Sequence, residues 1–544
     1  MKKNWLSYIC AAVLLSGTLT SCNESKFLDL KDPNHFTGDD FWRDKADAES
    51  ALAAAYSPIK YQMYGYYGAF DGWLNLNGRG DDIFTIPNEE PGMWAIANFE
   101  NSPTTGNDPY GALFAGVQRA NVLLRYIDEV PASGITEEDR SMIKGEALFL
   151  RAYQYFLLVN NYKEVPLRII PSNEDESNKP AASEASLWEQ VEKDFKAAIN
   201  CNLPVTRSGN EKGRVEKGAA IAMLAKVYLT QHKYPEAKEQ LDLLLKAPYY
   251  PGRYDLMENF AENFTTAKEN NEESVFELQY SSDGDLTWGN ESGINLGSSI
   301  PQFIGPVVAG GWAKLMPSAF AVGSFMSEER PAGSDTKYDK RMYASLFFNP
   351  EPLGDVIKNK NWYGDNHSMK ALWDGNAGKM ADSSTPTFSM GDGMFLLKKY
   401  TAYYVNDAAA DNMGNKEGKA NNIRVMRFAE VLLMYAEACA KTNDVTGANF
   451  ALKLIRKRAG LAEKTFTQDQ LMDQIEHQCL LEFFGEGHRF EDLKRWYTSD
   501  KIKEIFKANA KQGADNFQEK HRYYPIPTGE LNNNSAMRQI DLWK

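Results

Sequence analysis

The sequence predicts a mostly α-helical protein in which antiparallel helix pairs form a frame, long irregular loops are inserted into it, and β-structure is minor. Hydrophobic positions recur at helical spacing through much of the chain, and two stretches repeat the same order of small and large apolar residues. Residues 57–111 and 246–422 instead lose the helical period and become rich in Gly, Asn, Asp, Pro and aromatic residues. The periodic stretches predict the frame, and the interruptions predict the loops.

The N-terminal leader predicts export and a lipid anchor. Two lysines precede a predominantly apolar run over residues 5–15, which is too short to span a bilayer and is typical of a secretory signal. The leader ends in "LTSC" (19–22), which matches the lipobox of bacterial lipoproteins, where the peptidase cuts before a lipid-modified cysteine. Each buried CH₂ of an acyl chain contributes about 0.8 kcal/mol, so several chains anchor firmly. We expect a signal peptide over 1–21, a lipid anchor on Cys22 and a tether over 22–38, with an ordinary signal peptide as the alternative.

Composition and charge agree with an exported, water-soluble body. No later stretch approaches the roughly 18 consecutive apolar residues of a spanning helix. Loss of the leader changes the formal net charge from −14 to −16, and such an acidic chain is a poor partner for nucleic acid or anionic head groups. Beyond the anchor, Cys201, Cys439 and Cys479 have neither CxxC nor metal-ligand spacing, so we expect free, buried thiols and no disulfide framework.

The helices of the frame follow from apolar residues that recur three and four positions apart. In chain order, helical stretches are expected at residues 39–56, 113–130, 145–159 and 187–199, then two helices within 217–245, two within 431–460, and a further helical stretch at 474–496. The helices at 145–159 and 187–199 form a loose pair because an inserted loop separates them.

Small residues at a fixed distance predict how the helices pair. In "KGAAIAMLAKVYLTQHKYPEAKEQLDLLL", Ala225 and Ala237 lie twelve residues apart on two helical faces, which lets two antiparallel helices approach closely. Ala436 and Ala448 repeat this offset within 431–460. Such spacing is typical of tetratricopeptide repeats. We therefore expect about four tetratricopeptide-like pairs, stacked as a right-handed scaffold.

One strand is expected between the helices. In "EESVFELQYS" (272–281), large apolar side chains occupy every second position, a pattern typical of β-structure. Long loops on a rigid frame are where binding surfaces usually lie. We expect one domain over 39–544, with ligand-binding loops inserted around 57–111 and 246–422.

Several blocks, found in order along nearly the whole mature chain, give a resemblance to a known family. They read "CNESKFLDL", "FWRDKADAESALAAAY", "QRANVLL", "GEALFLRAYQYFLLVNNYKEVPL", "KGAAIAMLAKVYL", "NNEESVFELQY", "RVMRFAEVLLMYAEA", "LIRKRAGL", "LLEFFGEGHRFEDLKRW" and "YYPIPTGELNNNS". The chain resembles the SusD/RagB-like nutrient-uptake lipoproteins of Gram-negative outer membranes. This resemblance implies a SusD-like fold on the outside of the cell outer membrane. It also implies capture of a nutrient, usually a glycan, for a partner SusC-like TonB-dependent transporter.

The loops have the composition of a carbohydrate site. Aromatic rings stack on the apolar faces of sugars, while carboxylate, amide and guanidinium groups hydrogen-bond the hydroxyls. In the family that the chain resembles, the site combines the segment after the first helix with loops of the second half. The candidate glycan contacts in this sequence are Asp71, Trp73, Arg79, Asp81, Trp94, Asn98, Trp288 and Trp312. The alternative for each ring is that it only packs its loop onto the frame.

Other functions stay open at this point. A glycoside hydrolase needs two carboxylates roughly 5–9.5 Å apart, and 74 Asp and Glu residues could supply such a pair in almost any fold. The sequence has no GxSxG elbow, phosphate loop or GxGxxG motif, so catalysis is not expected. A RagB-like peptide carrier is the stronger rival, although tryptophans with Asn and Asp favour sugar.

No cofactor and no metal ligands are expected from the motifs. An Asp/Asn-rich loop could hold a structural Ca²⁺ ion, but no stretch fits the DxDxDG pattern. His488 lies near Glu486 and Glu491, yet aromatic residues flank it and no second histidine stands at ligand spacing. We expect His488 to be a core histidine that fixes a helix corner.

Overall fold

The computed structural model describes most of the chain after the tether. The described residues are 41–60, 67–68, 72–85, 91–105, 109–172, 174–281, 297–305, 312–348, 350, 353–355, 389–390, 393–404 and 420–544. Cys22, Asp71 and Trp288 lie outside these ranges, as do the leader and the tether.

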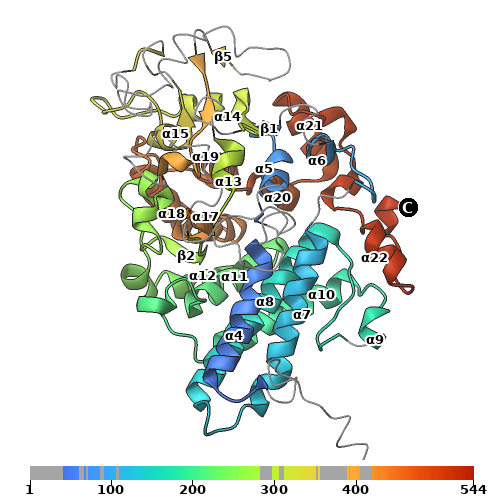
Figure 1. Cartoon of the computed structure of the whole chain (residues 1–544). Coiled ribbons are helices and arrows are strands. Elements are labelled where there is room, and N and C mark those ends of the chain that lie inside the picture. Colours follow the sequence, from blue (N-terminus) through green and yellow to red (C-terminus); the bar gives the residue numbers. More distant parts are fainter. Residues whose placement is uncertain are drawn as a thin grey trace, which may run out of the picture.

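The protein is mostly α-helical, as the sequence predicts, and its long helices pack side by side (Figure 1). They are α4 (Lys45–Tyr56), α7 (Tyr110–Tyr126), α8 (Glu137–Tyr162), α10 (Glu184–Asn200), α11 (Lys217–Thr230), α12 (Tyr234–Leu244), α17 (Phe428–Lys441), α18 (Val445–Arg458) and α19 (Gln468–Glu482). Each one from α7 onward packs on the next in this order. The tetratricopeptide form of the pairs and the handedness of the scaffold stay predictions.

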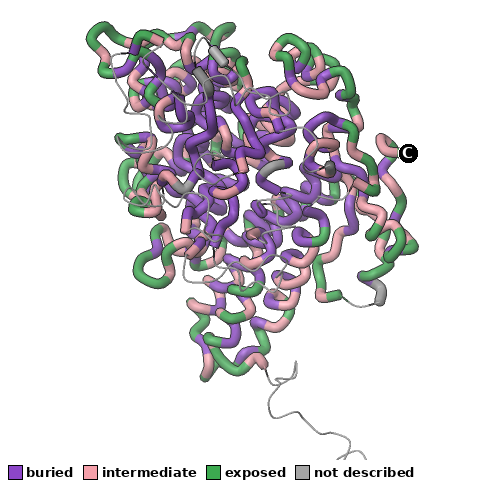
Figure 2. The backbone as a smooth tube through the Cα atoms, turned by 45° about the horizontal axis from the view of Figure 1, so that its top comes forward, coloured by how far each residue is buried: buried purple, intermediate pink, exposed green. Residues whose placement is uncertain are grey.

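The alanines expected between paired helices are fully buried. Ala225 and Ala237 have no exposed surface, and α11 packs on α12. Ala436 and Ala448 are equally buried where α17 packs on α18. A methyl side chain lets two helix axes approach closely, and this approach explains the repeated spacing. Figure 2 shows the buried residues gathered along the inside of these helices.

Polar residues before the helices explain where several of them begin. The Thr136 hydroxyl accepts a hydrogen bond from the backbone N–H of Asp139 at the start of α8. At α19, Thr467 and Gln470 form a capping box, in which each side chain accepts from the backbone N–H of the other. Caps of this kind satisfy N–H groups that have no partner within the helix.

The helical stretch expected over 474–496 consists of two helices, with the expected corner between them. α19 ends at Glu482, and α20 (Arg489–Trp496) begins after a turn. Gly485 and Gly487 in this turn have φ of 73° and 80°, a left-handed conformation that side chains other than glycine rarely adopt. The turn redirects the chain and places His488 at the start of α20.

The strands form four two-stranded antiparallel sheets among the described residues. The expected strand is confirmed as β2 (Ser274–Leu278), which pairs with β8 (Ile423–Arg427). All five residues of β2 are buried, so the protein covers both faces of this strand. The alternation of apolar and polar residues in its sequence therefore does not correspond to a solvent-exposed face. A second sheet joins β1 (Ile83–Thr85) to β3 (Leu315–Pro317).

A cluster of buried ion pairs fastens β2 and β8 to the last helices of the row. Arg427 pairs with Glu273, Glu482 and Glu486, with its Nη1 2.9 Å from Glu482 and its Nη2 2.7 Å from Glu486. Arg458 of α18 also pairs with Glu273 and Glu482. Arg341, Lys399 and Asp339 complete this buried ion cluster. Four cations balance four carboxylates, as burial of charge requires.

Two further expectations concern the thiols and the membrane. Cys201, Cys439 and Cys479 are free, and the last two are buried while Cys201 is half-buried. Within the described residues, no helix is both long enough and apolar enough to cross a bilayer.

Candidate functional site

The two loop insertions meet at one end of the molecule through the β1–β3 sheet. Ile83 lies opposite Pro317, and Thr85 lies opposite Leu315. α5 (Leu74–Gly78) and α6 (Pro91–Ala97) flank β1, while α13 (Ile300–Ile304) packs beside β3 (Figure 1). Segments more than 200 residues apart in sequence are therefore neighbours. We call this region the loop face.

The loop face carries two half-buried tryptophans among the candidates. Trp94 lies on α6, and no aromatic ring among the described residues contacts it. Trp312 precedes β3, and its ring lies 4.8 Å from that of the buried Phe303. The Lys314 ammonium lies 5.9 Å from the Trp312 ring centre. Each tryptophan is held by its backbone while part of its ring reaches the surface.

Trp73 and Arg79 are inside the protein, and their expected contact with a glycan stays a prediction. Trp73 is 2% exposed and packs edge-on against Tyr400 at 5.0 Å. Arg79 is 4% exposed, and its Nη2 donates to the carbonyl of His521 at 2.6 Å. Its guanidinium also stacks over the Phe490 ring at 3.9 Å. Both side chains hold the loop face on the frame.

Asp81 and Asn98 also bond to other residues of the protein, and their expected contacts with a glycan likewise stay predictions. Arg489 donates to both oxygens of Asp81, at 2.6 and 3.1 Å, and Asp81 is 1% exposed. Asn98 is buried, and its Nδ2 donates to the carbonyl of Trp94 at 2.8 Å. Asn98 thus closes the end of α6 and fixes the backbone of Trp94.

Residues from the C-terminal part of the chain support α6, and no sequence motif predicts these contacts. Lys511 donates to the carbonyl of Ala97 at 2.9 Å, and burial lowers the pKa of Lys511 to about 7. Gly513 has φ of 73°, and a Cβ there would lie 2.5 Å from the backbone of Asn98. Phe99 packs beside these residues in a small apolar cluster with Phe506 and with other C-terminal side chains. More than 400 residues separate these partners, so no local pattern could reveal them.

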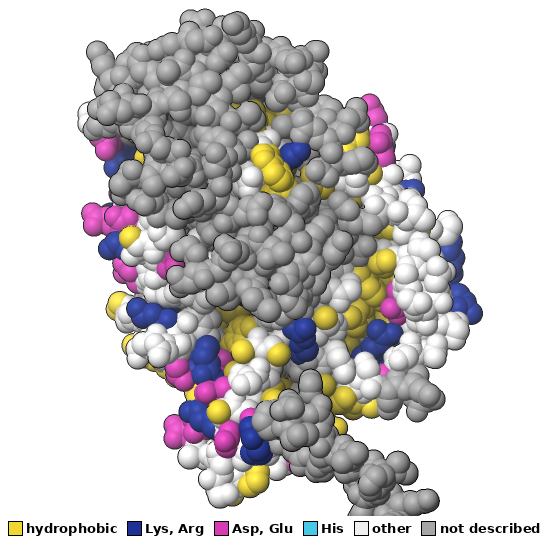
Figure 3. Space-filling model, in the orientation of Figure 1, with side chains coloured by type: hydrophobic (Ala, Val, Ile, Leu, Met, Phe, Trp, Pro, Cys, Tyr) yellow, Lys and Arg dark blue, Asp and Glu magenta, His cyan; other side chains and the backbone are white. Residues whose placement is uncertain are grey.

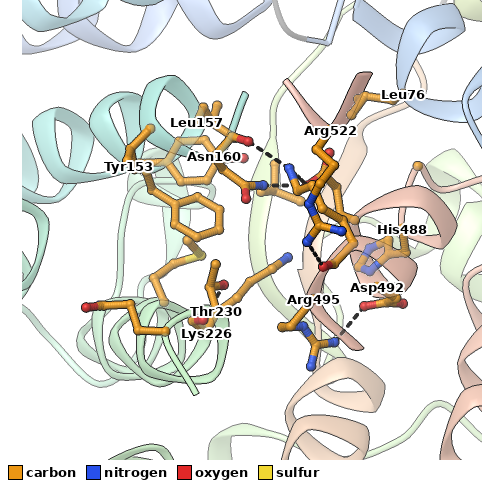
Figure 4. Close-up of a pocket in the computed structure, with 18 of the residues that line it drawn as sticks. Leu76, Tyr153, Leu157, Asn160, Lys226, Thr230, His488, Asp492, Arg495 and Arg522 are labelled. Atoms are coloured by element: carbon orange, nitrogen blue, oxygen red, sulfur yellow. Dashed lines mark hydrogen bonds and ion pairs between the residues drawn. The ribbon is translucent and has the colours of Figure 1, made fainter. Parts of the chain in front are cut away.

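A second feature of the molecule is a cavity of about 420 Å³ among the helices, partly open to solvent. Its walls come from α8, α10, α11 and α20 and from Arg522 and Tyr523 (Figure 4). None of the candidate glycan contacts within the described residues lines it. His488 does line it, and its ring stacks on Phe483 at 4.4 Å. The expectation that His488 fixes a helix corner fits its place at the start of α20.

The described residues do not contain a cluster of three His, Cys, Asp or Glu side chains that could hold a metal ion. On the face shown in Figure 3, basic and acidic side chains alternate along the lower, helical part and form no patch of one sign. The expectations about Ca²⁺ and nucleic acid stay predictions.

The structure is a helical frame with two loop insertions that meet at one end. Comparison with known protein families shows which family has this architecture. The chain belongs to the SusD family, whose family model matches residues 272–543. A second family model, described as "Starch-binding associating with outer membrane", matches residues 26–229. The resemblance inferred from the sequence blocks is therefore confirmed.

Individual relatives cover almost the whole chain. The starch-binding protein SusD of Bacteroides thetaiotaomicron is 24% identical over 100% of both chains. A SusD-like protein of Formosa agariphila is 25% identical over 98% of both. Among solved structures, a SusD superfamily protein of Bacteroides vulgatus is 25% identical and superposes with a TM-score of 0.76 over 92% of this chain and all of that one. A laminarin-binding SusD-like protein is also 25% identical, with a TM-score of 0.71 over 92% of this chain and 99% of that one.

Proposed function

We propose that this protein captures a glycan at the outer surface of the cell and binds it on the loop face without chemical change. The observation that carries the proposal is that Trp94 and Trp312, both half-buried, stand on segments joined by the β1–β3 sheet. Aromatic rings presented on a fixed backbone are suited to stack on sugar faces. Relatives named for starch and laminarin binding support the same class of ligand.

Location and partner are part of the proposal. The lipobox before Cys22 supports a lipid anchor, and the family description "associating with outer membrane" supports the membrane concerned. A lipid-anchored capture protein then delivers its glycan to a SusC-like TonB-dependent transporter. Replacement of Cys22 by Ala is expected to move the protein from the outer-membrane fraction to the soluble fraction. Persistence in the membrane fraction would contradict the anchor.

The capture proposal is tested by calorimetric titration of the chain truncated after Cys22 against maltohexaose, laminarihexaose, other plant, microbial and host oligosaccharides, and a peptide digest. Trp94→Ala and Trp312→Ala are each expected to weaken glycan binding about tenfold or more, because a ring that covers a sugar contributes roughly 1.5–3 kcal/mol. Trp42→Ala is the matched control, because this half-buried ring stacks on Tyr126 of the frame. Its binding should equal that of the wild type.

Three results would redirect the proposal. Saturable binding of peptides alone would favour a peptide carrier, and oligosaccharides that shorten with time would favour a hydrolase. Glycan binding that survives in both tryptophan variants would place the site away from Trp94 and Trp312. Circular dichroism of each variant shows whether it has kept its fold.

A further inference from the structure

The cavity has the dimensions of a ligand site, and none of the described candidate residues of the loop face lines it. Its volume of about 420 Å³ falls within the roughly 300–1,000 Å³ typical of small-molecule pockets. Helices from both halves of the chain build it, with Tyr153 and Asn160 of α8 and Lys226 of α11 facing His488 and Arg495 of α20 (Figure 4).

The cavity runs from the surface toward the core. His232 is exposed and Thr230 and Tyr523 are half-buried, so these lining residues mark its mouth. Tyr67 and Tyr153 are 8% and 2% exposed and mark its floor, where their hydroxyls share a hydrogen bond of 2.7 Å. A small molecule could therefore enter from solvent and reach buried aromatic side chains.

His488 offers hydrogen-bonding groups inside the cavity. No hydrogen bond joins either of its ring nitrogens to another described residue, and its Nδ1 lies 3.8 Å from Glu430. Burial lowers the pKa of His488, although Glu430 opposes this effect. The imidazole is therefore neutral at pH 7 and presents one donor and one acceptor. A buried polar group without a hydrogen bond is energetically unfavourable, so a ligand that hydrogen-bonds to this imidazole is stabilised in the cavity.

Most of the charged groups of the wall already have partners, and the guanidinium group of Arg522 donates to the carbonyls of Tyr497 and Lys494. Lys226 lies 2.7 Å from Glu430, Lys494 lies 2.6 Å from Glu491, and Arg495 donates to Asp492 at 2.7 Å. Arg495 also pairs with Glu437. A charged ligand would have to break one of these pairs, which costs several kcal/mol when the partners are buried. The wall therefore suits a neutral ligand.

The wall also combines rings with uncharged polar groups. Phe156 and Trp188 lie with ring centres 6.0 Å apart, and both line the cavity. Asn160, Thr230 and Gln231 add amide and hydroxyl oxygens that can accept hydrogen bonds, while their donors already bond to Glu491, to the carbonyl of Lys226 and to Glu192. Rings that cover apolar faces and amides that meet hydroxyls are the groups that recognise polyhydroxylated molecules.

We propose that this cavity is a second binding site, distinct from Trp94 and Trp312 of the loop face, for a neutral, hydroxyl-rich molecule of one or two sugar units. The rings of Phe156 and Trp188 contact its apolar side, and the neutral imidazole of His488 hydrogen-bonds a hydroxyl. This proposal does not depend on glycan binding at the loop face.

The first experiment follows the imidazole of His488 by NMR in the ¹⁵N-histidine-labelled protein, with His488→Phe used to assign its signal. Glucose, galactose, xylose and maltose are the neutral probes, and glucosamine and glucuronate are charged probes of the same size. We expect at least one neutral probe to shift the His488 signal saturably, with the charged probes at least tenfold weaker. No saturable shift with any neutral probe, or a preference for a charged probe, overturns the proposal.

Two variants locate the site by calorimetry. Thr230→Trp places a large ring at the mouth and should weaken binding of the neutral probe at least tenfold, while Glu189→Trp, on an exposed position of α10, should leave it unchanged. His488→Phe keeps a ring against Phe483 and should weaken binding by about three- to tenfold, the contribution of one hydrogen bond. Thr230 is half-buried, so Thr230→Trp is expected to keep the fold. Thr230→Trp therefore tests the site even if His488→Phe fails to fold.

The loop face provides the remaining control. Trp94→Ala is expected to weaken only binding at the loop face, so the neutral probe should still shift the His488 signal in this variant. Loss of the probe in Trp94→Ala together with full binding in Thr230→Trp would assign the binding to the loop face and overturn the second site. If the cavity binds no probe, glycan capture at the loop face is unaffected, so the two proposals fail independently.

Discussion

Asp82 is a buried carboxyl group in an unfavourable place. It is 4% exposed, and its Oδ1 has no hydrogen-bond partner among the described residues. Burial, with a smaller contribution from the neighbouring Asp81, raises the pKa of Asp82 to about 7. The folded protein therefore holds a proton that the unfolded chain releases near pH 4, and stability falls as the pH rises from about 4 to about 7.

Replacement of Asp82 by Asn is expected to remove this cost. The variant should be more stable than the wild type at pH 8, by an amount on the order of a few kcal/mol, since each pKa unit corresponds to about 1.4 kcal/mol. The difference should shrink as the pH falls from about 7 to about 4. Urea denaturation across this range measures it, with the exposed Asp500→Asn as control. A difference that does not change with pH would show that Asp82 is ionised throughout.

Single residues also show how far sequence can locate the site. Composition and the family resemblance selected loop residues of the right chemical types, and two of them, Trp94 and Trp312, are half-buried on the loop face. Arg79 and Asp81 have equally suitable side chains but are buried against His521 and Arg489. These partners lie more than 400 residues away, so burial was decided by long-range packing that no local pattern records.

Among the elements, the buried ion cluster joins β2, β8, α18 and α19. Glu482 has no exposed surface, and its carboxylate forms ion pairs with Arg341, Arg427 and Arg458. Burial alone would raise its pKa, but the three arginines outweigh burial and hold the pKa far below its usual range. Removing this one charge leaves several buried guanidinium groups incompletely paired.

We therefore expect Glu482→Gln to lower the free energy of unfolding by about 3–5 kcal/mol, the usual loss when one partner of a buried ion pair is removed. Guanidinium or urea denaturation measures the change. Glu504→Gln, which breaks an exposed pair with Lys501, is the matched control and should change stability by less than about 1 kcal/mol. Equal effects of the two substitutions would mean that the cluster is not needed for stability.

The same elements show which parts of the fold the sequence determines locally. α11 and α12 were predictable because their apolar period and their small residues act within some thirty residues. β1 and β3 were not, because each strand has three residues and their pairing joins positions more than 200 residues apart. The corner between α19 and α20 falls in "FFGEGH", where the sequence predicts that His488 fixes a helix corner.

At the scale of the whole molecule, helices from the two ends of the chain form one packed row. α12 packs on α17, although the insertion between them spans more than 180 residues. One continuous core extends through both groups of helices. If residues 39–544 form a single domain, both groups of helices should unfold together.

Calorimetry of the chain truncated after Cys22 should show one cooperative unfolding transition, with the calorimetric enthalpy equal to the van 't Hoff enthalpy. Two units with separate cores would unfold in two steps. Limited proteolysis during heating offers an independent check, because a single unit should lose both groups of helices together. Two resolved transitions would contradict the single domain.

The pairing of β2 with β8 has a consequence for how this protein could change over time. The long segment between these strands begins and ends at adjacent points of the frame, since Ser274 lies opposite Arg427 and Leu278 opposite Ile423. Closing a longer chain between fixed neighbours is inexpensive, because each doubling of a flexible loop adds only about 0.6 kcal/mol. The loops of this inserted segment can therefore be lengthened or replaced at little cost in stability. Ligand preference can diversify in this way while the helical frame stays the same.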